Sequence, residues 1–104
     1  MANKQELVDF LDKHVFQPIL NENPDRHHGA DRKKLEDVQD STRSEIDRFK
    51  HYRNAEEVVT NYKRDLHSEA AKKVNRELEA LHLPTLRSVE DEFLRLAGER
   101  SGEG

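Results

Sequence analysis

The sequence contains no cysteine among its 104 residues. A disulfide framework, a zinc site with thiolate ligands and a cysteine nucleophile are therefore excluded. It also lacks an excess of charge of one sign, because basic and acidic residues are interspersed and the formal net charge is −4. Such a surface has no overall attraction for nucleic acids or anionic membranes, and we expect neither as a partner.

Long hydrophobic runs are missing as well. No apolar stretch approaches the ~20 residues that a transmembrane helix needs. The first ten residues, MANKQELVDF, lack the basic start and apolar run of a signal peptide, so we expect a cytoplasmic protein. The length suits one domain with a small core, which we expect to span residues 1–97, followed by a disordered tail at 98–104.

Proline and glycine are absent between Asp31 and Leu83, and this segment carries three apolar stripes at helical spacing. The stripes consist of Leu35, Val38, Thr42, Ile46 and Phe49, then Ala55, Val59, Tyr62 and Leu66, then Ala70, Val74, Leu78 and Leu81. On a helical wheel the second is rotated by roughly 145° from the first, and the third by roughly 110° from the second. One straight helix could not turn all three towards one partner. Separate helices are predicted, with the larger apolar side chains of the stripes in the core.

Residues suited to helix caps lie near the expected boundaries. Pro18 should end the first helix, and Asp31 is a plausible N-cap of the second. Asn54 and Glu57 have capping-box spacing at the first stripe rotation, and Ser68 suits a cap at the second. The alternative at Ser68 is one continuous helix whose apolar stripe drifts.

The end of the chain has its own boundary signals. Pro84 should stop the fourth helix, Thr85 or Ser88 should cap the last one, and Gly98 suits its C-terminal cap. Alternating β-branched runs are absent, so no strand is predicted. The predicted fold is all-α, a compact array of four to five helices at approximately 4–17, 31–53, 55–66, 69–82 and 86–97.

The first helix carries more apolar side chains than one face can hold, since Phe16 points roughly opposite Leu7 on the wheel. Phe16 and Ile19 could close one end of the core. Alternatively, they could form a second buried face between subunits, with Phe10, Phe16 and Ile19 at the contact of a twofold dimer.

Basic residues gather around the start of the second helix, where the helix dipole is already positive. They could bind a phosphate or carboxylate group. This candidate anion site consists of Arg26, His27, His28, Arg32 and Lys33. The alternative is a solvated helix start whose charges are compensated by acidic residues four positions later.

The same loop offers nitrogen and oxygen ligands for a transition metal in Asp25, His27, His28 and Asp31. The alternative is a surface cluster that binds no metal. A di-iron site is excluded, because only one Glu-x-x-His motif, Glu79 with His82, is present.

No motif for catalysis is visible, as the serines lack an elbow-like glycine frame and both a P-loop and a dinucleotide fingerprint are absent. We therefore expect no cofactor and no enzyme. The predicted function is a non-enzymatic helical protein-interaction module. We expect it to self-associate as a twofold dimer, and another protein is the other possible partner. The alternative is a protein that binds a small anion or metal ion at Asp25–Lys34. An enzyme with an acid–base site would be revealed by a pocket lined by titratable groups with shifted pKa values.

Overall fold

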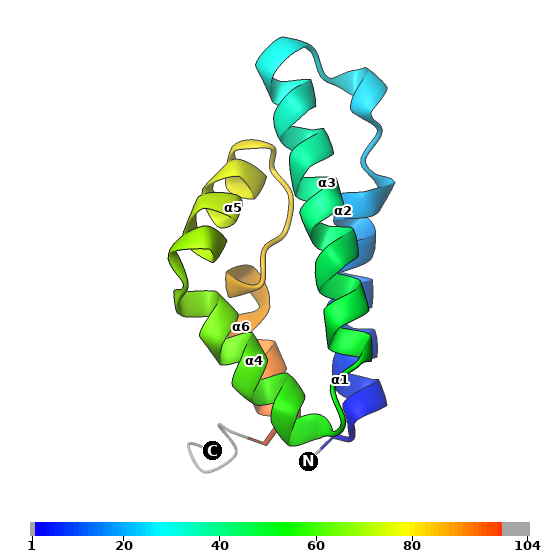
Figure 1. The fold of residues 1–104 in the computed structure, drawn as a ribbon, viewed down its shortest axis with the longest axis vertical. Helices are drawn as coiled ribbons and strands as arrows, with labels where there is room; N and C mark the ends of the chain where they lie inside the picture. The colour runs from blue at the N-terminus through cyan, green and yellow to red at the C-terminus, as the bar shows by residue number, and fades with distance from the viewer. Residues whose placement is uncertain (1, 99–104) are drawn as a thin grey trace.

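The computed structural model describes residues 2–98, which form helices joined by short turns, with no strand among them (Figure 1). The predicted all-α fold is confirmed. The α-helices are α1 (Lys4–Leu11), α2 (Gln17–Asn21), α3 (Gly29–Lys50), α4 (Ala55–His67), α5 (Glu69–Ala80) and α6 (Glu90–Leu96). A π-helical turn, Asp12–Phe16, joins α1 to α2, and 3₁₀ turns cover Pro24–Arg26 and Arg87–Val89. None of these helices is long and apolar enough to cross a membrane.

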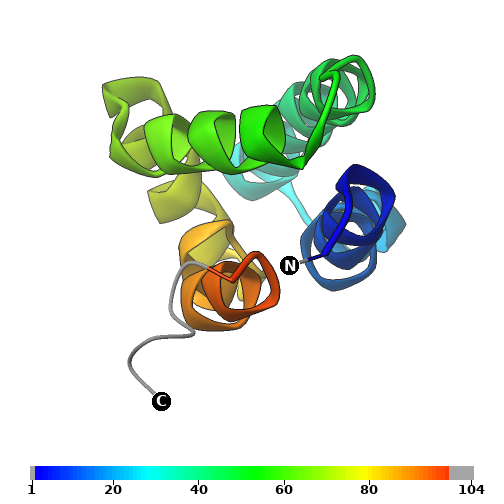
Figure 2. The same ribbon diagram turned by 90° about the horizontal axis from the view of Figure 1, so that it is seen from below.

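The helices form two arms that diverge from a shared end, where the first and last of the described residues lie (Figure 1). One arm contains α1, α2 and α3, and the other contains α4, α5 and α6. Seen from that end, α4 starts beside the end of α3 and runs away from it, and α6 lies near α1 (Figure 2). Contacts of α1 with both α4 and α6 join the arms, and α5 contacts α3 farther along. The backbone N–H of Ala2 donates to the carbonyl of Leu96, which ties the two ends of the chain together.

The core lies where the three stripes meet. Seven of the ten large side chains predicted to be in the core are buried, namely Leu35, Val38, Phe49, Val59, Tyr62, Leu66 and Leu78. Ile46, Val74 and Leu81 are half-buried and pack against this core. The Tyr62 ring lies 4.0 Å from that of Phe93, centroid to centroid, and its hydroxyl donates to the carbonyl of Leu86. The buried hydroxyl is therefore hydrogen-bonded, as burial of a polar group requires.

Capping residues separate α3, α4 and α5 as predicted. The side chain of Asn54 accepts the backbone N–H of Glu57 at 2.9 Å, and Ser68 Oγ accepts that of Ala71 at 3.0 Å. Ser68 therefore marks a true break between α4 and α5. Glu57 does not complete the usual capping box, because its carboxylate accepts the backbone N–H of Arg53.

The prediction that Asp31 caps the second helix was wrong. α3 begins at Gly29, and His28 occupies the N-cap position without a side-chain hydrogen bond. Gly29 has a φ of 56°, a left-handed conformation that glycine adopts without steric cost, so the chain can enter the helix two residues earlier. Asp31 lies in the first turn, where its negative charge favours the helix dipole.

The expected helix end before Pro18 was also wrong, because the helical path continues to Asn21. A proline inside a regular helix would leave one carbonyl without a donor and clash with the preceding turn. Here the N–H of Gln17 donates to the carbonyl of Asp12, five residues back, and widens the turn. Pro18 then falls in the first turn of α2, where its missing N–H is tolerated.

The last two helices are shorter than predicted. His82 has a φ of 61°, and the Leu83 N–H donates to the carbonyl of Leu78, which closes α5 at Ala80. Thr85 and Ser88 each accept the other's backbone N–H at 3.0 Å and begin the 3₁₀ turn before α6. Gly98, with a φ of 83°, follows α6 as expected. The rest of the predicted disordered tail, 99–104, lies outside the described residues.

The surplus apolar surface of the first helix lies inside this chain. Phe16 and Ile19 are each only 2% exposed, and Phe10 is half-buried with its ring 6.1 Å from that of Phe93. This burial favours the interpretation that Phe16 and Ile19 close one end of the core. The argument for a dimer contact at Phe16 and Ile19 was therefore wrong, because neither side chain has exposed surface that a second copy could contact.

Phe49→Ala should destabilise the fold by about 3–5 kcal/mol, because the ring is fully buried against Phe16 and Tyr52. Urea unfolding monitored by circular dichroism measures the loss. Phe10→Ala, at a half-buried position, is the matched control and should cost less. An unchanged unfolding midpoint for Phe49→Ala would contradict the assigned core.

Candidate functional site: the cleft between α3 and the α4–α5 pair

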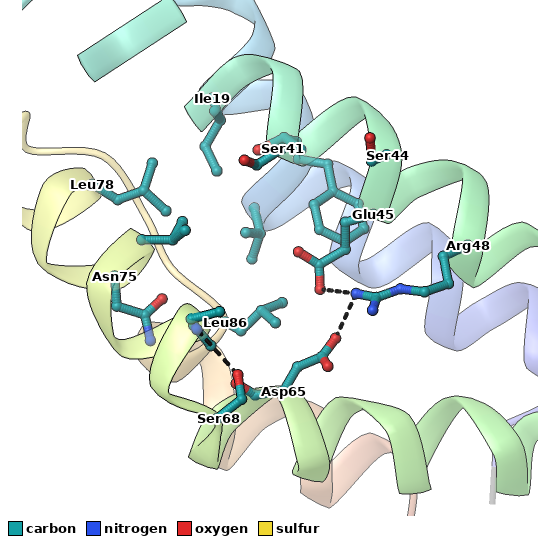
Figure 3. Close-up of a pocket in the computed structure, with 16 residues that line it drawn as sticks. Ile19, Ser41, Ser44, Glu45, Arg48, Asp65, Ser68, Asn75, Leu78 and Leu86 are labelled. Carbon is teal, nitrogen blue, oxygen red and sulfur yellow. Dashed lines mark hydrogen bonds and ion pairs between the residues drawn. The ribbon is translucent and has the colours of Figure 1, made fainter. Parts of the chain in front are cut away.

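A cleft of about 420 Å³ opens between α3 and the α4–α5 pair (Figure 3). This volume is within the usual range of small-ligand sites and also suits side chains of a bound protein. Ile19 and Leu78 lie at its apolar end, and Leu86 lies between them and Asp65. Glu45, Arg48 and Asp65, hereafter the charged cluster, lie at its polar end.

Two helices supply the charged cluster. Glu45 and Arg48 lie three residues apart on α3 and therefore share a helix face, whereas Asp65 lies near the end of α4. Arg48 Nη2 donates to Asp65 Oδ2 at 2.8 Å and to Glu45 Oε1 at 3.2 Å. A single guanidinium nitrogen thus bridges the two arms. Arg64 Nε lies 3.6 Å from the other oxygen of Asp65.

Exposure differs strongly within the cluster. The Asp65 side chain is 11% exposed, that of Glu45 is 23% exposed and that of Arg48 is 44% exposed. The two carboxyl groups therefore lie in a poorly hydrated environment, while the guanidinium reaches solvent. Electrostatic interactions between groups that are shielded from water are stronger than those on an open surface.

This environment raises the pKa of Glu45 from its usual 4.5 to about 8. Burial is the largest cause, and the hydrogen bond and negative charge of Asp65 act in the same direction. Arg48 lowers the pKa but does not outweigh them. At neutral pH the Glu45 carboxyl therefore retains its proton in most molecules.

The predicted anion site is neutralised by its own neighbours. Arg32 lies 3.4 Å from a carboxylate oxygen of Asp25 and 3.7 Å from one of Glu36. His27 Nε2 lies 2.8 Å from Glu22. Carboxylates thus occupy positions that a bound anion would take, which favours the interpretation as a solvated helix start. The other proposed residues, Arg26, His28 and Lys33, are exposed, and none of the five lines the cleft.

The predicted metal site is not assembled. Within residues 2–98, no three histidine, cysteine or acidic side chains are grouped so that they could hold a metal ion. Asp25 pairs with Arg32 and His27 pairs with Glu22, so two of the four expected ligands have other partners. Asp25, His27, His28 and Asp31 therefore do not converge on one point.

The charged cluster was missed in the sequence. The spacing of Glu45 and Arg48 indicates an ion pair on one helix, but such pairs are common on exposed surfaces. Asp65 stands beside Leu66 of the second stripe, at the edge of a face that turns inward. Its meeting with α3 depends on the angle between two helices, which no local pattern encodes.

Comparisons with known proteins add no relationship: no family model matches the chain, and no curated protein or solved structure matches it significantly.

The stability of the protein should fall between pH 5 and 8 in a manner that depends on Glu45. The pKa of the Glu45 carboxyl is about 8 in the folded chain and 4.5 when unperturbed, as in the unfolded chain. The folded state therefore binds more protons than the unfolded state in this range. Stability then decreases as pH rises. Urea unfolding at several pH values should show a smaller decrease for Glu45→Gln than for the parent.

Glu36→Gln, an exposed change on the same helix, is the matched control. If Glu45→Gln and the parent lose stability equally between pH 5 and 8, the shifted pKa is refuted.

Proposed function

We propose that this chain is a non-enzymatic protein-interaction module whose cleft receives an apolar side chain from a segment of another protein. The observation that carries the proposal is the cleft itself, which is lined by apolar side chains such as Ile19 and Leu78 and, on the opposite side, by the charged cluster (Figure 3). Protein interfaces gain most of their affinity from a few large side chains that enter such pockets, with a polar rim around them.

The apolar end supplies the affinity. Val74 lines the cleft and is only half-buried, so part of its surface remains in contact with water. Burying a large apolar side chain contributes roughly 1.5–3 kcal/mol. One anchoring side chain and its neighbours in the segment therefore supply a useful part of a binding free energy.

The partner in this proposal is a different protein rather than a second copy of the chain. The sequence predicts self-association, and that expectation depends on apolar surface at Phe16 and Ile19. Both side chains belong to the core of the same chain.

One observation favours an acid–base enzyme as a second candidate. A carboxyl group with a pKa of about 8, such as that of Glu45, can give or take a proton near neutral pH. Binding remains the preferred proposal because Arg48 engages both carboxyl groups of the cluster and no histidine lines the cleft. An enzyme would convert a bound molecule, whereas a binding module would release it unchanged.

Ala70→Phe should abolish peptide binding, because Ala70 lines the cleft and a phenyl ring there would fill it. The probe is a displayed library of random 12-residue peptides, selected on the parent protein and then tested on variants. Ala80→Phe is the matched control, since Ala80 is also exposed on α5 but lies outside the cleft. We expect selected peptides to carry a large apolar residue and to bind the control like the parent. Selected peptides that bind the Ala70→Phe variant unchanged would overturn the proposal.

A dilute sample should behave as a monomer of 12.2 kDa in light scattering. The physical reason is that Phe16 and Ile19 are consumed in the core and leave the first helix without a second apolar face. A stable dimer that dissociates on Phe10→Ala substitution would contradict this prediction and would support the first helix as a subunit interface.

A further inference from the structure

The polar end of the cleft holds two carboxyl groups and one guanidinium. Arg48 uses the same nitrogen for both of its hydrogen bonds, to Glu45 Oε1 and Asp65 Oδ2. The second carboxyl oxygen of Glu45 points into the cleft, towards the side formed by α5 (Figure 3). A ligand that occupies the cleft therefore meets an acidic oxygen before it reaches the guanidinium.

We propose that the protein segment bound in the cleft places a lysine or arginine side chain against Glu45 and Asp65. This inference rests on the proposed function and names the charge of its partner. With both carboxyl groups ionised, Glu45, Asp65 and Arg48 carry a net charge of −1. Arg64 also lies 3.6 Å from Asp65, but its side chain is 61% exposed, so solvent screens much of its charge. One cation added inside the cleft balances the other three groups. The apolar stem of a basic side chain suits the apolar walls beside the cluster, while its charged end pairs with the carboxylates.

The raised pKa of Glu45 supports this charge argument. When no cation is bound inside the cleft, Glu45, Asp65 and Arg48 together remain neutral because Glu45 retains a proton at pH 7. A bound ammonium or guanidinium group would take over that role, and the proton would leave to solvent. Recognition of the cation is then coupled to the release of up to one proton.

The groups facing Glu45 are few, so its titration can be followed. Arg48 is beside it on α3, and Asp65 faces it from α4, with Arg64 behind Asp65. The side chains that α5, α2 and the π-helical turn contribute to the cleft carry no titratable group. A pH dependence of binding between pH 7 and 9 therefore reports on Glu45.

Arg48 could instead bind an anionic ligand, so the experiment compares a cationic, a neutral and an anionic probe. The probes are hexylammonium, 1-hexanol and hexanoate, which share an apolar stem and differ in charge. Binding is measured from NMR chemical shifts of the backbone amides of residues 70–78. An alkylammonium, like a lysine side chain with a pKa near ~10.4, stays charged between pH 7 and 9.

We expect hexylammonium to bind more tightly than 1-hexanol, and hexanoate to bind more weakly than both. The association constant of hexylammonium should rise about tenfold from pH 7 to pH 9, as Glu45 with a pKa of about 8 ionises. The association constant of 1-hexanol should not rise. Glu45→Gln should remove this increase with pH and reduce the affinity for hexylammonium to that for 1-hexanol. Glu36→Gln, on the exposed face of α3, should preserve both.

Asp65→Asn is a second variant that removes the other carboxylate. At pH 9, where Glu45 is ionised in the parent and the variant, it should also weaken hexylammonium binding. Equal affinities for the three probes, or a preference for hexanoate, would overturn this inference while leaving the cleft as an apolar binding site. If no probe shifts the amides of residues 70–78, the proposed function fails together with the inference.

Discussion

The direction of the apolar face changes twice along the chain, at Asn54 and at Ser68, and this constraint determines how α3, α4 and α5 pack. Each helix must turn its own stripe towards the same core, so the chain has to bend at both points. Cap hydrogen bonds at these two residues stabilise the bends. The two arms, and the cleft between them, follow from this geometry because α4 leaves the end of α3 at an angle and α5, farther from the shared end, contacts α3 again (Figure 1).

Burial of charge is the second constraint. A carboxylate removed from water is destabilising unless it gains a partner or a proton. Asp65 has Arg48 at 2.8 Å and Arg64 at 3.6 Å, which compensates its loss of hydration. Glu45 shares Arg48 with Asp65 and retains a proton as well. In the proposal above, this end of the cleft accepts a cation when Glu45 loses its proton. A single cluster links the stability of the fold to what the cleft can bind.

Sequence patterns predicted the local structure well where one physical effect dominated. Helical periodicity placed Phe49 and Tyr62 in the core, and side chains able to cap a helix located the break at Ser68. The helix end predicted at Pro18 was wrong because a wider π-helical turn removes the expected steric clash. That turn forms because the backbone N–H of Gln17 donates to the carbonyl of Asp12, which no local sequence pattern indicates. The N-cap predicted at Asp31 was wrong because Gly29, with its positive φ, permits the helix to begin earlier.

The site was less predictable than the fold. A cluster such as Arg26 with the two histidines stands out in a sequence because its members are adjacent, but adjacent residues often meet neighbouring carboxylates, as His27 meets Glu22. Asp65 and Glu45 are twenty positions apart. Their meeting depends on the crossing of α3 and α4, which periodicity does not determine.

The state of the Glu45 carboxyl group tests the account most directly. The carboxyl carbon of Glu45, followed by NMR across a pH titration of the free protein, reports its protonation at the cleft. The account predicts a midpoint at about pH 8 in the parent, since Glu45 is held beside Asp65 in a poorly hydrated cleft. A midpoint at the usual value of 4.5 would mean that the two carboxyl groups do not share this environment, and would contradict the charged cluster as described.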